Sequence, residues 1–359
     1  MAGWQKRHSF ADQSLRMPVK TLIINGKFLS QQATGVQKYA LGLSRVLQLT
    51  CPGVIIAAPA GSYPDAGLRI RKSRMFKGWF WEQYILPLQI YFRKDRILLN
   101  LCNSAPIILR RQAVSIHDLA VYRDPSWFSF TFRTWYRFLL PRITRKARLV
   151  LCVSEHIRQE MISRFGLPAE KIILIPNGLP DIRPDKDPPF PFPYLMLTGV
   201  HNPRKNAAFV LRLIGRIRSL GWQVVATGSD AAIFGDRKAH RQEGLHLNNY
   251  VSEGRYYSWL QHAGALIFPS HYEGFGIPVL EALSMGVPVI LPDRPEYRQN
   301  FGRLPHYYED QNEESFLRVL AGVKNHRPDP SDVLLMKNMY NFERSAALLA
   351  EQLNISPAQ

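Results

Sequence analysis

The chain has 359 residues, of which 46% are hydrophobic and 21% are charged, and this composition excludes a disordered or fibrous protein. The length favours two domains. No run of about 18 apolar residues occurs, so we expect no membrane-spanning helix. The three cysteines, Cys51, Cys102 and Cys152, are far apart and match no zinc-binding spacing, which favours buried free thiols in a reducing cytoplasm.

The net charge of +18 belongs to the first half of the chain. Residues 1–180 contain 27 of the 46 basic residues but only 9 of the 28 acidic ones, and the rest of the chain is balanced. Such a field attracts polyanions, namely nucleic acid, anionic lipid headgroups or diphosphate-linked acceptors. A generally basic proteome, with no particular partner, is the alternative explanation.

Short apolar runs alternate with helical patterns along the first half. Residues 19–25 fit a strand buried on both faces, and a loop is expected at 27–34. The predicted strands are 19–25, 54–59, 97–101, 113–116, 149–153 and 171–175, and the predicted helices are 35–49, 128–143 and 155–165.

A proline-rich linker is expected at residues 181–193, and a second alternation follows it. The predicted strands there are 194–198, 223–227, 246–249, 265–268 and 288–292, and the predicted helices are 207–220, 253–261, 278–284 and 332–353. This pattern indicates an α/β protein with two Rossmann-like, doubly wound parallel sheets. Open sheets of this kind bind ligands at the carboxyl ends of their strands, so the site should lie in loops after strands.

One segment, residues 268–290, combines a strand, a glycine-rich loop and a helix that opens at Pro278. Gly274 and Gly276 let the backbone approach a ligand, and the helix N-terminus offers N–H groups to phosphate oxygens. Glu281, expected in the first turn of the helix, can accept hydrogen bonds from ribose hydroxyls, and Glu273 can reach hydroxyls of a donor sugar. An ordinary Rossmann-like turn with two glutamates is the alternative.

This segment resembles the E-x7-E motif of the family 4 glycosyltransferases, which have the GT-B fold. Glu273 and Glu281 match the two carboxylates, and Gly274-Phe275-Gly276 matches the loop between them. Arg204 and Lys205 match the family's basic pair, which binds the donor diphosphate and offsets the charge on the leaving group. Such fixed cations suit a site without a metal. A solvated surface pair is the alternative for these two residues.

Weaker matches extend the resemblance to both halves of the chain. Gly35 lies in a loop that resembles the one approaching the donor phosphates, and Tyr250 with Val251 lies where the family contacts the nucleotide base. His117 matches a histidine placed near the transferred sugar, and it is alternatively a turn histidine that caps a strand.

The resemblance implies two Rossmann-like domains that face a cleft. The expected division is an acceptor domain at 17–180, a linker at 181–193, a nucleotide-sugar domain at 194–335, and a last helix at 336–355 that packs back on the first domain. It also implies a retaining reaction through an oxocarbenium-like state. We expect no cofactor beyond the donor and no metal, since the single D-x-D spacing, Asp185-Lys186-Asp187, lies in the linker.

The resemblance to bacterial mannosyltransferases of surface-polysaccharide assembly suggests GDP-mannose as donor and a lipid-linked (polyprenyl diphosphate) saccharide as acceptor. The basic stretch 69–77 and the aromatics Trp79, Phe80 and Trp81 predict contact with an anionic membrane. The protein would then be peripheral, on the cytoplasmic face of the inner membrane. Core aromatics beside solvated arginines are the alternative, and the sequence does not indicate an oligomeric state.

Two other functions compete with glycosyl transfer. A nucleotide-sugar epimerase with the GT-B fold would share the donor motifs, although the basic pair together with E-x7-E argues against it. A nucleic-acid-binding protein would explain the charge, but no nucleic-acid motif occurs and the basic region is interleaved with strand–helix units, so we expect no nucleic-acid partner.

Overall fold

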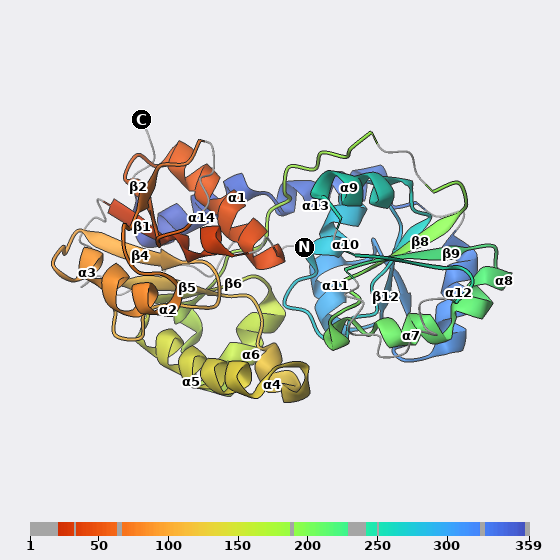
Figure 1. The fold of residues 1–359 in the computed structure, drawn as a ribbon, viewed down its shortest axis with the longest axis horizontal. Helices are drawn as coiled ribbons and strands as arrows, with labels where there is room; N and C mark the ends of the chain where they lie inside the picture. The colour runs from red at the N-terminus through yellow and green to blue at the C-terminus, as the bar shows by residue number, and fades with distance from the viewer. Residues whose placement is uncertain are drawn as a thin grey trace. The chain divides into compact units, whose positions relative to one another are not determined.

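The computed structural model describes residues 21–31, 34–62, 67–186, 190–228, 242–249, 251–323 and 327–355. The chain divides into two compact units (Figure 1). The first unit comprises Met1–His117, Thr134–Pro176 and Phe342–Gln359, and the second comprises Asp118–Arg133 and Asn177–Asn341.

The first unit is built on a parallel sheet of seven strands in the order β3-β2-β1-β4-β5-β6-β7. The chain adds β2 and β3 on one side of β1 and then crosses to add β4 on the other, so the topological switch point lies between β1 and β4. The strands are β1 Thr21–Asn25, β2 Val54–Ala58, β3 Ile70–Lys72, β4 Arg96–Asn100, β5 Gln112–Ile116, β6 Leu149–Cys152 and β7 Ile172–Leu174.

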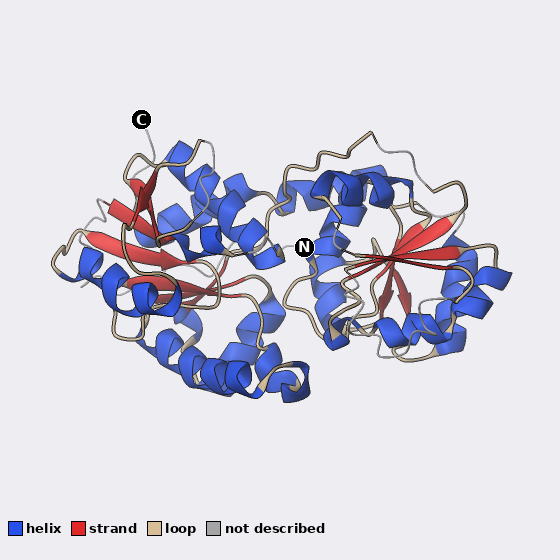
Figure 2. Ribbon diagram, in the orientation of Figure 1, coloured by secondary structure: helices blue, strands red, loops and turns tan. Residues whose placement is uncertain are grey.

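Helices cover both faces of this sheet (Figure 2). Parallel strands covered on both faces lose contact with water, and all five residues of β5 are buried as this arrangement requires. The helices of the first unit are η2 Gly26–Ser30, α1 Gly35–Thr50, α2 Gly78–Phe80, η3 Trp81–Ile85, α3 Leu86–Tyr91, α5 Phe130–Lys146, α6 Glu155–Phe165, η5 Ala169–Lys171 and α14 Phe342–Leu353, with α5 starting in the second unit.

The second unit repeats the architecture with six parallel strands in the order β10-β9-β8-β11-β12-β13, and its switch point lies between β8 and β11. The strands are β8 Tyr194–Thr198, β9 Gln223–Thr227, β10 Leu245–Asn248, β11 Ala265–Ile267, β12 Val289–Pro292 and β13 His306–Tyr308. Its helices are α4 Ala120–Arg123, η4 Pro125–Trp127, η6 Pro203–Lys205, α7 Ala207–Arg212, α8 Ile214–Ser219, α9 Glu253–His262, α10 Ile277–Ser284, α11 Pro295–Phe301, α12 Glu313–Val323 and α13 Pro330–Met339. The predicted fold class, two doubly wound parallel sheets, is confirmed.

Several predicted elements differ in detail. The loop expected at 27–34 begins with a 3-10 helix, because the side chain of Asn25 accepts the backbone N–H of Lys27. The helix expected at 207–220 breaks at Leu213, which has φ −98° and ψ 0°. The last helix expected at 332–353 is two helices, since Tyr340 leaves the helical conformation and packs its ring against Phe275.

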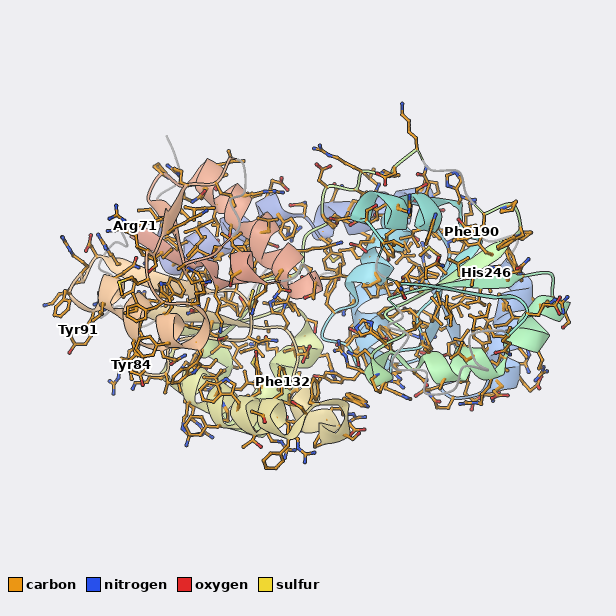
Figure 3. The ribbon with its side chains drawn as sticks, in the orientation of Figure 1. Arg71, Tyr84, Tyr91, Phe132, Phe190 and His246 are labelled. Carbon is orange, nitrogen blue, oxygen red and sulfur yellow. The ribbon has the colours of Figure 1, made fainter. Side chains whose placement is uncertain are left out.

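The predicted linker is attached to the second unit where it is described. The ring centroid of Phe190 lies 4.9 Å from that of Trp259 and 6.1 Å from that of His246. Figure 3 shows Phe190 beside His246 in the second unit. The backbone N–H of Asp185 donates to the carbonyl of Gly254, and Asp187 lies outside the described residues.

The predicted membrane patch is corrected at one residue. Trp81 is fully buried and packs with Ile23 and Leu98, because the helix that contains it lies against the sheet. Trp79 and Phe80, by contrast, are 44% and 46% exposed. None of the helices that the structure describes is both long and apolar enough to cross a membrane.

Candidate active site

Four charged side chains of the second unit meet at its switch point. Lys205 and Arg204 lie in η6, which follows β8, and Glu273 lies in the loop after β11. Lys205 Nζ is 2.7 Å from Glu273 Oε1, and Arg204 Nη1 is 3.8 Å from Glu273 Oε2. Arg204 Nη1 also donates to Asp118 Oδ2 at 3.4 Å. The carboxyl ends of strands that flank a switch point are where open α/β sheets bind ligands.

Backbone and amide contacts fix the basic pair. The side chain of Asn202 accepts the N–H of Arg204 at 3.0 Å, and Asn206 ends the 3-10 helix in the left-handed region with φ 52°. Asn206 Nδ2 donates to the carbonyl of Pro269, and the N–H of His271 donates to the carbonyl of Arg204. The loop after β8 is therefore tied to the loop after β11.

Glu273 is a buried, ionised carboxylate. Burial alone would raise the pKa of its carboxyl group, but the charges of Arg204 and Lys205 together outweigh burial and lower that pKa below its ordinary value. The Lys205 ammonium also lies 4.6 Å from the centroid of the Phe268 ring. Arg204 Nε is buried and has no hydrogen-bond partner among the described residues. A buried donor of this kind requires an acceptor, and an oxygen-rich ligand would provide one.

Glu281 lies in the second turn of α10, which corrects the expected first turn. The helix begins at Ile277 after Gly276, whose φ of 103° is a conformation that glycine adopts without strain, so Glu281 is the fifth helical residue. Glu281 is 2% exposed, and the hydroxyl of Tyr257 lies 2.9 Å from its Oε1. The same hydroxyl lies 2.9 Å from Glu253 Oε1, so α9 holds the Glu281 side chain in place.

The loop Gly274–Gly276 is anchored through its central residue. Phe275 is buried and packs edge-on against the rings of Phe301 and Tyr340. Asn300 Nδ2 donates to the carbonyl of Phe275 at 3.1 Å. The side chain of Phe275 therefore supports the loop, and any ligand contact there is left to the backbone.

The remaining predicted site residues are distributed between the two units. Val251 is half-buried next to Ser252, whose side chain caps α9, whereas Tyr250 lies outside the described residues. His117 and Gly35 belong to the first unit, where Gly35 is the first residue of α1.

His117 is buried at the end of β5. Its ring nitrogen Nε2 lies 2.7 Å from the carbonyl oxygen of Leu101, so Nε2 carries a proton, and its backbone N–H donates to Asn103 Oδ1 at 2.6 Å. The ring meets that of Tyr39 edge-on at 4.8 Å. These contacts give His117 a structural role at the end of β5.

Three residues that contact the site, Asp118, Tyr257 and Tyr272, have no assigned role in the sequence prediction. Asp118 pairs with Arg204, and the hydroxyl of Tyr272 accepts the N–H of Leu119 at 3.0 Å. Asp118 directly follows the predicted histidine, and its pairing with a residue 86 positions away leaves no sequence signal. Tyr257 was missed for the same reason. Among the residues that the structure describes, no group of three or more His, Cys, Asp or Glu side chains is arranged to hold a metal ion.

Family models match both halves of the chain. Residues 193–318 match "Glycosyl transferases group 1", and residues 34–183 match "Glycosyltransferase Family 4". The chain belongs to the family 4 glycosyltransferases. The predicted family is therefore confirmed, and with it the general activity of a glycosyltransferase.

Curated relatives of this glycosyltransferase include enzymes of O-antigen synthesis. The O-antigen chain mannosyltransferase RfbU of Salmonella typhimurium is 24% identical over 286 residues, which cover 77% of this chain and 78% of that protein. The O-antigen chain mannosyltransferase B of Escherichia coli is 26% identical over 204 residues, which cover 52% of this chain and 54% of that protein. Both matches are distant.

Solved structures support the GT-B fold. HepE of Anabaena, solved in complex with UDP and glucose, superposes with a TM-score of 0.65 at 13% identity, over 93% of this chain and 99% of that one. Identity this low establishes the shared fold alone.

Proposed function

We propose that this glycosyltransferase is a retaining, metal-independent hexosyltransferase that uses a nucleotide diphosphate sugar, with GDP-mannose as the first candidate. Its acceptor would be a lipid-linked saccharide in the synthesis of a surface polysaccharide. The similarity to two O-antigen mannosyltransferases supports the sugar and the pathway class. The donor class is also supported by HepE, which shares the fold and was solved with UDP and glucose bound.

The observation that supports this proposal most is the buried cationic pair at the switch point of the second sheet. A departing nucleotide diphosphate develops negative charge, and Arg204 with Lys205 provides two fixed positive charges in a site of low dielectric. Such a pair can stabilise the negative charge of the leaving diphosphate as a divalent ion would. The buried Nε of Arg204, which lacks an acceptor among the described residues, would then donate to a phosphate oxygen.

The reaction can be written for these residues. The bond between the anomeric carbon and the phosphate oxygen breaks, and its electron pair stays on that oxygen, beside Arg204 and Lys205. An acceptor hydroxyl bonds to the anomeric carbon from the same face, and its proton passes to the leaving phosphate oxygen. Because the acceptor attacks directly, no carboxylate nucleophile is required. Glu273 would orient the sugar, Glu281 the ribose, and His117 a sugar hydroxyl.

The exposed surface of the first unit supports a lipid-linked acceptor. The side chains of Arg71, Lys72, Arg74 and Lys77 are exposed, next to the half-exposed Trp79 and Phe80 in sequence. Tyr84 and Tyr91 continue this surface at 53% and 67% exposure, and Figure 3 shows them on the same side of the unit as Arg71. Basic side chains with aromatics suit an anionic headgroup region.

Donor binding provides the first test. A thermal-shift screen of GDP-mannose, UDP-glucose and other nucleotide sugars, with EDTA throughout, should find one that raises Tm, because ligand at 100 times its Kd stabilises the fold by about 2.7 kcal/mol. A chain whose Tm responds to none of these donors would contradict the proposal.

A further inference from the structure

The first unit has a second ion pair at its own switch point. Lys27 lies in η2 directly after β1, and its Nζ is 2.8 Å from Glu82 Oε2. This repeats the second unit, where Lys205 follows β8 and pairs with Glu273 at 2.7 Å. The proposed donor site uses the switch point of the second sheet. At the switch point of the first sheet, Gly35 at the far end of the loop after β1 is the residue predicted to approach the donor, and the pair of Lys27 and Glu82 has no assigned ligand.

Buried hydrogen bonds fix the Glu82 carboxylate at this place. Glu82 is 1% exposed, and three donors of the described residues reach it: Asn25 Nδ2 at 2.9 Å, Ser104 Oγ at 2.5 Å and Lys27 Nζ at 2.8 Å. Asn25 also donates to Asn100 Oδ1 at 3.0 Å, and these two residues are the last of β1 and β4. The network therefore spans the two strands that define the switch point.

Glu82 is presented by an unusual element. It lies in η3, a π-helix, and π-helical turns are rare and frequently found at functional sites. In this helix Trp81 fills the core, Glu82 joins the buried network, and Tyr84 is exposed. The same helical segment therefore connects the exposed aromatic surface to the switch point.

Lys27 is the member of the pair that a ligand can reach. Its side chain is 21% exposed, and the hydroxyl of half-buried Ser104 lies 3.4 Å from Nζ. An ammonium group has three donors, and among the described residues only Glu82 and Ser104 face them, which leaves one donor for a ligand. Lys27 is a single cation held by Glu82, whereas the donor site sets Arg204 beside Lys205. The pair of Lys27 and Glu82 therefore suits an uncharged polyol better than a second diphosphate.

The loop after β4 relates this pair to His117. Leu101 and Asn103 form hydrogen bonds with His117, and the next residue, Ser104, forms a hydrogen bond with Glu82. A ligand on Lys27 would therefore lie along the loop that also holds His117, the histidine that the family resemblance places near the transferred sugar.

We propose that Lys27 and Ser104 form an acceptor subsite that hydrogen-bonds hydroxyl groups of the acceptor's terminal sugar, with Glu82 as the residue that positions Lys27. This proposal rests on the proposed function, since it assigns the acceptor of that reaction. The donor would then bind at the carboxyl ends of β8 and β11, and the acceptor at the carboxyl ends of β1 and β4.

Separate measurements of donor binding and transfer test this subsite. The probes are the nucleotide diphosphate of the active donor, for calorimetric Kd, and octyl mannoside and other octyl glycosides as acceptors. Lys27→Met should raise the acceptor KM at least tenfold and leave the nucleotide Kd within twofold. Glu82→Gln should shift KM in the same direction, and Lys27→Arg should restore part of the loss.

A matched lysine controls for charge and folding. Lys171→Met removes a half-buried lysine of the same unit, which donates to the carbonyl of Arg145 beside the edge strand β7, and it should leave both constants unchanged. Two results for folded Lys27→Met would overturn the acceptor subsite without contradicting the proposed function. One is an unchanged acceptor KM, and the other is a nucleotide Kd that rises by the same factor as the acceptor KM. A wild-type chain that transfers to no glycoside from any donor would contradict the proposed function as well.

Discussion

At the residue scale, the site depends on the balance between burial and charge at Glu273. Two cations hold this carboxylate ionised although it is almost fully buried, and removal of the carboxylate leaves the buried Lys205 ammonium without its partner. Such removals typically cost about 3–5 kcal/mol. In the proposed function the same two cations meet the donor diphosphate, and in the free protein Glu273 and Asp118 compensate their charges.

Glu273 should therefore make the fold sensitive to acid. Its pKa is lower in the folded protein than the ordinary 4.5, so its contribution to stability is full above pH 4.5 and is lost as the pH falls through the lower, folded value. Glu273→Gln should reduce Tm at neutral pH and flatten the decline of Tm between pH 5 and pH 3. A variant whose Tm follows the wild-type curve in parallel would show that the pair contributes no pH-dependent stability.

Glu281 is predicted to contribute directly to the affinity for the nucleotide. Replacement of Glu281 by Gln removes a charged acceptor for the ribose hydroxyls, and charge-assisted bonds contribute about 1.5–3 kcal/mol, which corresponds to a nucleotide Kd at least tenfold higher. Glu314→Gln is the matched control, because Glu314 pairs with Arg216 on the surface of the same unit at 2.6 Å. Calorimetric titration with the nucleotide diphosphate measures both variants, and equal affinities would refute the ribose assignment.

At the element scale, packing decides the positions of helices that the sequence leaves open. Helix α14 lies on α1 within the first unit, where Gly42 faces the ring of Phe342 so closely that a Cβ atom would overlap it. Periodicity indicated a single helix from 332 to 353. It could not show that Tyr340 would pack on Phe275 and that the chain would break there.

The contact between Gly42 and Phe342 should reverse the usual effect of a glycine-to-alanine change in a helix. Gly215→Ala, in the exposed part of α8 with open space around it, should raise stability by up to about 1 kcal/mol, because alanine favours the helix. Gly42→Ala should instead lower stability by about 1–3 kcal/mol, because overpacking outweighs that preference. Urea unfolding of the two variants compares them, and a stabilised Gly42→Ala would be inconsistent with the α1–α14 packing.

At the scale of the whole molecule, the fold class and the places of Glu273 after a strand and Glu281 in the following helix could be predicted from the sequence, because period and loop chemistry are local. The buried position of Trp81, the second-turn position of Glu281 and the pairing of Asp118 with Arg204 could not. Each depends on which elements pack together. The alternation of strands and helices indicates a parallel sheet but does not give the strand order that defines a switch point.

The net positive charge of residues 1–180 predicts that the first unit binds anionic membranes. In flotation with vesicles, the wild type should bind those rich in anionic lipid and not zwitterionic ones, and Trp79→Ser with Phe80→Ser should lower the bound fraction severalfold. Leu334→Ser with Leu335→Ser is the matched control, because these exposed leucines belong to α13 in the second unit. Equal loss in both double variants would assign the binding to exposed apolar surface in general.

Product analysis tests the central claim most directly. With the donor that raises Tm, an octyl glycoside acceptor and EDTA, the chain should release nucleotide diphosphate and form a glycoside with the same anomeric configuration as the donor, identified by NMR. Loss of transfer in EDTA that a divalent metal restores, or a product of inverted configuration, would contradict a retaining, metal-independent reaction at Arg204, Lys205 and Glu273.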